Sequence, residues 1–227
     1  MRLHTRLVAA TFALLFIVIP GCAEPVVTET NREVVLLDQI QQTEPGPTRD
    51  NYIRELEKVP TFRRSFFQRW FFIHTSFDDF RGWTDNGYDP SQSLLPRDVQ
   101  LLGATDYGKS DIENGGFHQF FYNHTGTYAP EMIEWLTRAG FPEAASTVKD
   151  AMAVFGQEFP RSQSERQRFL STFSGNDQSD RDPFFLINDR FYSALDDVAA
   201  YEDAANQWLR ETCGISSLTD NYQEAEQ

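Results

Sequence analysis

The sequence predicts an all-α protein: a single compact multi-helix domain behind a signal peptide and a flexible tether. From Asn51 onward, apolar residues recur at spacings of three and four rather than two, and no alternating β-branched run is long enough for a strand. The 227-residue chain is 40% hydrophobic, which is enough for one substantial core and too little for a multidomain protein. Its 20 Phe, 8 Tyr and 4 Trp predict an aromatic-rich core.

Residues 1–21 have the pattern of a lipoprotein signal peptide. Arg2 and Arg6 precede an apolar run that extends from Leu7 to Pro20. This run is shorter than the roughly 20 apolar residues of a membrane-spanning helix, so it is typical of the hydrophobic part of an export signal. We therefore expect the mature protein to leave the cytoplasm.

The cleavage site allows two interpretations. The residues Ile19 to Cys22 resemble a bacterial lipobox, in which the cysteine sulfur is lipidated and the cysteine becomes the first mature residue. We expect such lipidation at Cys22 and a membrane-anchored lipoprotein that faces the periplasm or the cell exterior. Cleavage after Ala23, with secretion as a soluble protein, is the alternative, because Gly21 and Ala23 also satisfy the small-x-small rule.

Composition divides the rest of the chain. Residues 22–48 are rich in Pro, Thr, Glu and Gln, and we predict a flexible tether there. The alternative is an N-terminal helix around Val34 to Ile40 that docks on the domain. Residues 49–214 are predicted to form the helical domain, and residues 215–227 a disordered tail.

Prolines at helix starts and glycines after helix ends mark most of the domain's elements. The expected helices cover, in order, Phe62 to Phe72, the residues after Pro96, Phe117 to His124 before Gly126, Pro130 to Gly140, Pro142 to Gly156, Ser162 to Phe173, and Val198 to Leu209. The first of them alternates aromatic residues with Arg63, Arg64 and Arg69. A basic amphipathic face of this kind suits lipid contact, but its wide apolar stripe favours packing in the core.

One stretch carries a specific motif, Asn-Gly-Gly-Phe-x-Gln-Phe-Phe-x-Asn. Its residues, with two that follow, are Asn114, Gly115, Gly116, Phe117, Gln119, Phe120, Phe121, Asn123, Gly126 and Pro130. Together with the Asn188 to Tyr192 segment, the motif resembles the bacterial family named after DNA mimic protein nineteen, over about residues 94–210. The resemblance implies an all-helical domain without known catalysis or cofactor. It also implies a homodimer and an acidic surface, because the family's namesake is a dimer that occupies the DNA-binding face of a transcription factor.

The residues of the motif themselves favour a structural role. The two glycines permit backbone angles or close approaches that a Cβ would forbid, at the start of a helix with an aromatic face. The amides of Asn114, Gln119 and Asn123 can satisfy unpaired backbone groups at the two ends of that helix. A small-ligand pocket is the alternative, because amides beside glycines also suit a ligand.

The net charge of the chain and the distribution of its acidic residues limit the classes of partner that the protein could bind. The net charge of −14 makes direct binding to nucleic acid improbable, and we expect none. Residues 177–227 hold 12 acidic and 3 basic side chains, as a DNA mimic would need, but an exported protein does not meet a cytoplasmic repressor. We therefore predict a non-enzymatic interaction module that binds an unidentified envelope protein, with no catalytic residue, metal or cofactor. An enzyme or ligand-binding domain is the first alternative, and an acidic DNA mimic the second.

Overall fold

The computed structural model describes residues 29–60, 64–75, 83–84, 87–88, 95–173 and 182–220. The fold is all-α, as predicted, and the only strands in these ranges are the two-residue antiparallel partners β1 (Trp83–Thr84) and β2 (Gly87–Tyr88). The helices are α1 (Glu29–Gln42), α2 (Pro47–Glu57), α3 (Phe66–His74), α4 (Arg97–Tyr122), α5 (Ala129–Arg138), α6 (Pro142–Ala153), α7 (Gln163–Leu170), α8 (Phe185–Ala194) and α9 (Val198–Gln207). Short 3-10 turns follow α4 (His124–Tyr128) and α7 (Ser171–Phe173), and a π-helical turn (Trp208–Thr212) follows α9.

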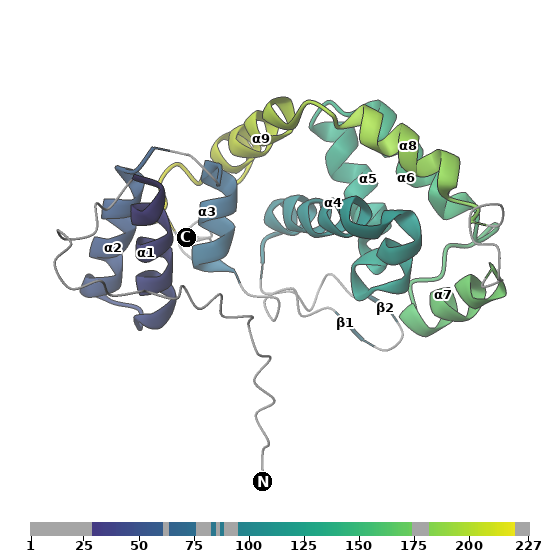
Figure 1. Cartoon of the computed structure of the whole chain (residues 1–227), viewed down its shortest axis with the longest axis horizontal. Helices are drawn as coiled ribbons and strands as arrows, with labels where there is room; N and C mark the ends of the chain where they lie inside the picture. Colours follow the sequence, from purple (N-terminus) through teal and green to yellow (C-terminus); the bar gives the residue numbers. More distant parts are fainter. Residues whose placement is uncertain are drawn as a thin grey trace, which may run out of the picture.

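Helix α4 lies at the centre of the molecule, with α5, α6 and α8 along one side and α1, α2 and α3 at one end (Figure 1). Its second half contributes the fully buried rings of Phe117, Phe120 and Phe121 to the core. The Phe117 ring centroid lies 6.3 Å from that of Phe184 and 5.4 Å from that of Phe191 in α8. The predicted aromatic core is therefore present, and it joins α4 to α8.

The predicted tether is wrong over most of its length. Residues 29–42 form α1, and the side chains of Leu36, Leu37 and Ile40 are buried against the neighbouring helices. The reason is an apolar face completed by a buried ion pair, in which Arg69 of α3 donates to Glu33 at 3.0 Å. The docked helix, considered above as the alternative, is the arrangement found. Residues 22–28 lie outside the described ranges.

Helix α3 packs in the core, as the width of its apolar stripe predicts. Phe67 and Trp70 are fully buried, and Arg69 points inward, where it donates to the backbone carbonyls of Val59 and Pro60 at 2.9 Å each. The helix begins at Phe66 rather than Phe62. A buried Arg69 cannot contribute to a basic membrane-facing surface.

The predicted disordered tail is also wrong for its first six residues. The side chains of Ile215 and Leu218 are buried. The indole Nε1 of Trp70 donates to the carbonyl of Asp220 at 2.8 Å, and the Leu218 N–H donates to Glu57 Oε1 at 2.7 Å. The segment 215–220 is thus held against α2 and α3, while residues 221–227 lie outside the described ranges.

Candidate functional site

The two glycines of the motif interrupt α4. Gly115 has φ −162° and ψ 25°, and Gly116 has φ 69° and ψ −174°, so the helix is broken there into two halves. Only Gly116 lies in the left-handed region that favours glycine. The second half therefore starts at the motif, as the sequence predicts.

Helix α8 is bonded to both sides of this kink. Asn188 accepts a hydrogen bond on Oδ1 from the backbone N–H of Phe117 at 2.8 Å, which caps the second half of α4 from outside the helix. The Tyr192 hydroxyl donates to the carbonyl of Ile112, in the first half, at 2.8 Å. A Cβ on Gly116 would lie 2.6 Å from Asn188 Nδ2, so the close contact between the two helices requires glycine. We call Gly116, Phe117, Asn188 and Tyr192 the brace.

The motif amides bond to a carboxylate rather than to helix ends. Asp111 accepts hydrogen bonds from Gln119 Nε2 at 3.3 Å, from Asn123 Nδ2 at 2.9 Å and from the Thr125 hydroxyl. The expectation that Gln119 and Asn123 satisfy backbone groups is therefore wrong in detail, although both serve the fold. The side chain of Asn114 is exposed to solvent.

A buried arginine satisfies the C-terminal end of α4. Arg166 of α7 donates to the carbonyls of Phe121 at 2.9 Å and of Asn123 at 3.0 Å. Burial, with a smaller contribution from Arg161, lowers the pKa of Arg166 to about 10, so it stays protonated at neutral pH. It takes the role that we had expected of side-chain amides in the motif.

The prediction that Gly126 ends this helix is wrong. Helix α4 ends at Tyr122, and Gly126 lies inside the 3-10 turn that follows. A Cβ at Gly126 would lie 2.6 Å from the Phe120 carbonyl oxygen, so the turn can fold back on the helix only with glycine there. Pro130 occupies the first turn of α5, as predicted.

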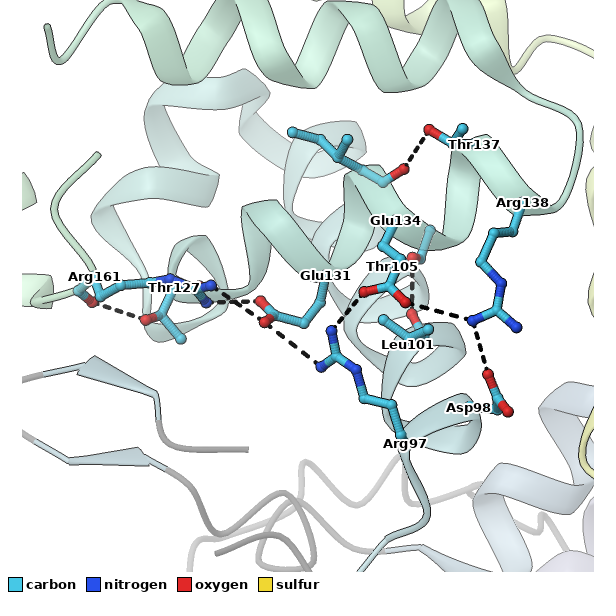
Figure 2. A network of polar contacts seen from close by, with 11 residues as sticks. Arg97, Asp98, Leu101, Thr105, Thr127, Glu131, Glu134, Thr137, Arg138 and Arg161 are labelled. Carbon is cyan, nitrogen blue, oxygen red and sulfur yellow. Dashed lines mark hydrogen bonds and ion pairs between the residues drawn. The ribbon is translucent and has the colours of Figure 1, made fainter. Parts of the chain in front are cut away.

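A chain of alternating charges joins the motif to the start of α4 (Figure 2). Glu131, one residue after Pro130, accepts from Arg161 at 2.7 and 3.2 Å and lies 3.6 Å from Arg97. Arg97 also forms an ion pair with Glu134 at 2.6 Å. The chain ends with Arg138, which pairs with Asp98 at 3.0 Å. Because Arg161 precedes α7, the network positions the helix that carries Arg166.

Asp106, on α4, is a carboxyl with a raised pKa. Burial raises the pKa of Asp106 in α4 to about 6, with Lys109 acting in the opposite direction. The ammonium group of Lys109 lies 5.2 Å from the ring centroid of buried Tyr201 in α9 and 2.5 Å from Glu113 Oε1.

The described residues contain neither a candidate metal site nor a membrane-spanning helix. No group of three or more His, Cys, Asp or Glu side chains in these ranges is arranged to hold a metal ion. No helix among them is long and apolar enough to cross a membrane. Cys22 lies outside the described ranges.

These features define an all-helical domain built on a kinked central helix that its own motif braces. Residues 93–212 match the family described as DMP19-like protein, and the chain belongs to this family. The predicted family resemblance is therefore confirmed, over nearly the range expected. No curated protein and no solved structure is significantly similar to the chain.

Sequence reasoning missed Asn188 and Arg166 as partners of the motif. Both bond to α4 from helices that come more than 40 residues later in the chain. The Asn188 to Tyr192 segment was part of the family resemblance, and that was the one signal pointing to its role. Nothing in the sequence around Arg166 distinguishes it from an exposed arginine.

Proposed function

We propose that the protein is a non-enzymatic protein-interaction module, exported and held at a bacterial membrane by a lipid on Cys22, and that it binds an envelope protein. Membership of the DMP19-like family supports an interaction role, because the family resemblance implies binding to a protein. The lipobox-like residues before Cys22 support the location.

The observation that carries the proposal is that the hydrogen-bonding groups of Phe117, Gln119 and Asn123 in the motif are used within the fold. Gln119 and Asn123 bond to Asp111, and the Phe117 N–H bonds to Asn188. The aromatic side chains of the motif are fully buried. A motif used in this way holds helices in position, so the function resides on the surface that those helices present.

Photo-crosslinking in intact cells tests the proposal. A photoreactive residue replaces one exposed side chain at a time: Val35 in α1, Leu186 in α8 or Asp203 in α9. We expect irradiation to give a discrete adduct with an envelope protein from at least one face, and no adduct without irradiation. Absence of a discrete adduct from all three faces would contradict an interaction role.

A further inference from the structure

Helix α8 exposes large apolar side chains to solvent. Leu186 is 72% exposed, Phe185 54% and Tyr192 39%. The opposite side of the same helix is packed in the core through Phe191, and Asn188 holds it to α4. The brace thus fixes α8 in an orientation that presents an apolar face outward, as a preformed binding surface does.

A groove of about 420 Å3 lies beside this face, between α6 and α8. Two carboxylates line it, Glu143 from α6 and Asp189 from α8. Arg190, the basic residue of the groove, pairs with Asp150 at 2.8 Å. In the part of the chain that the structure describes, no side-chain hydrogen bond or ion pair engages Glu143 or Asp189, and the groove lining carries one more acidic than basic side chain.

The exposed apolar residues of α8 and the carboxylates of the groove together indicate which kind of partner segment could bind there. The exposed apolar residues favour a partner with an apolar stripe, and the two carboxylates favour Lys or Arg beside that stripe. A bilayer with anionic lipids fits this face less well, because its negative charge would repel Glu143 and Asp189. In addition, α8 lies toward the end of the molecule opposite α1, the described helix that follows Cys22 (Figure 1).

We propose that α8 and the α6–α8 groove bind a cationic amphipathic segment of the partner protein. A Lys or Arg side chain enters the groove between Glu143 and Asp189, and apolar side chains of the same segment cover Phe185 and Leu186. This inference rests on the proposed function and adds the place and the chemistry of binding.

The test uses a synthetic peptide of about 14 residues with Leu and Lys at helical spacing, and a matched peptide with Glu in place of Lys. Both carry a fluorescent label, and anisotropy measures their binding to the full exported chain with Cys22→Ser. We expect the Lys peptide to bind and the Glu peptide not to bind. We expect Leu186→Ser and Asp189→Asn each to weaken binding about tenfold, because each removes a central contact.

Two control variants separate this site from general attraction to an acidic protein. Val35→Ser removes an exposed apolar residue of α1, and Asp203→Asn removes an exposed carboxylate of α9. We expect both to leave the dissociation constant within about twofold of the parent value. Failure of the Lys peptide to bind, or equal weakening by the controls and the α8 variants, would overturn the inference.

The crosslinking experiment distinguishes failure of this inference from failure of the proposed function. Adducts from position 35 or 203 together with none from position 186 would leave the interaction role standing and reject α8 as the contact. Absence of adducts from all three positions would reject both.

Discussion

Asn188 in α8 accepts a hydrogen bond from the backbone N–H of Phe117 at 2.8 Å, directly beside a glycine whose Cβ would lie 2.6 Å from the same asparagine. One side chain therefore both caps the second half of α4 and fills the space that Gly116 leaves open. This relationship explains why a double glycine and a distant asparagine belong to one structural unit. It also fixes the orientation in which α8 exposes Phe185 and Leu186 to solvent.

Gly116→Ala is expected to destabilise the domain through backbone strain and through contact with Asn188. Gly140→Ala is the matched control, because Gly140 also has a positive φ, of 92°, but no atom within 4 Å of the added Cβ. We expect Gly116→Ala to lower the free energy of unfolding by about 1 to 3 kcal/mol more than Gly140→Ala does. Chemical denaturation measures both. Equal losses would mean that the contact with Asn188 has no energetic weight.

The buried ion pair of α1 and α3 gives a second prediction. The Glu33 and Arg69 side chains are 1% and 3% exposed, whereas Glu55 and Arg32, a pair that also involves α1, are 32% and 50% exposed. Arg69→Ala leaves a buried charge without its partner and should cost about 3 to 5 kcal/mol of unfolding free energy. Arg32→Ala should cost less than about 1 kcal/mol. A small effect of both variants would argue that α1 is not docked in solution.

The sequence allowed the fold class, the aromatic core and most helix starts to be predicted, because proline, glycine and apolar spacing act locally. Helix α8 was not predicted as a helix. Its exposed Phe185 and Leu186 blur the apolar stripe that Phe184, Phe191 and Leu195 would otherwise mark. The same exposed side chains form the proposed binding face. The residues that made α8 hard to predict from the sequence are therefore the residues that support its proposed role in binding.

The tether and tail were mispredicted for a different reason. Polar residues outnumber apolar ones in both segments, and each segment is held by groups far away in the sequence. Glu33 bonds to a residue 36 positions later, and Leu218 to one 161 positions earlier. Local composition carries no information about such partners. The internal use of Gln119 and Asn123 was foreseeable, whereas their common acceptor, Asp111, was not.

The raised pKa of Asp106 predicts that the free energy of unfolding depends on pH. Its pKa in the folded protein is about 6, above the ordinary value of 3.8, so between about pH 4 and pH 6 the folded state binds more protons than the unfolded state. The contribution of Asp106 to the free energy of unfolding therefore falls as pH rises through this window and is constant above it. Asp106→Asn should stabilise the protein at pH 7.5, by at most about 3 kcal/mol, and much less at pH 4.

Denaturation of both proteins at the two pH values checks this prediction. Asp203→Asn, at an exposed site in α9, controls for the change in net charge. An Asp106→Asn effect of the same size at pH 4 and pH 7.5 would show that the carboxyl titrates normally.

The proposed lipid on Cys22 leads to a prediction about where in the cell the protein is found. If the cysteine is lipidated, the wild-type protein expressed in a bacterial host should appear in the detergent extract of membranes, and Cys22→Ser should move it to the soluble exported fraction. Cys213, the other cysteine, provides the control, and Cys213→Ser should partition like wild type. Identical partitioning of wild type and Cys22→Ser would remove the lipid anchor from the proposal.

The brace is tested most directly by a double-mutant cycle of Gly116→Ala and Asn188→Ala, with unfolding free energies measured by chemical denaturation. Removing the Asn188 side chain frees the space that the new Cβ needs, so Gly116→Ala should cost at least about 1 kcal/mol less in the Asn188→Ala background than in wild type. Costs that add to within about 0.3 kcal/mol would show that the two residues are energetically independent, and that the motif does not hold α8 in place.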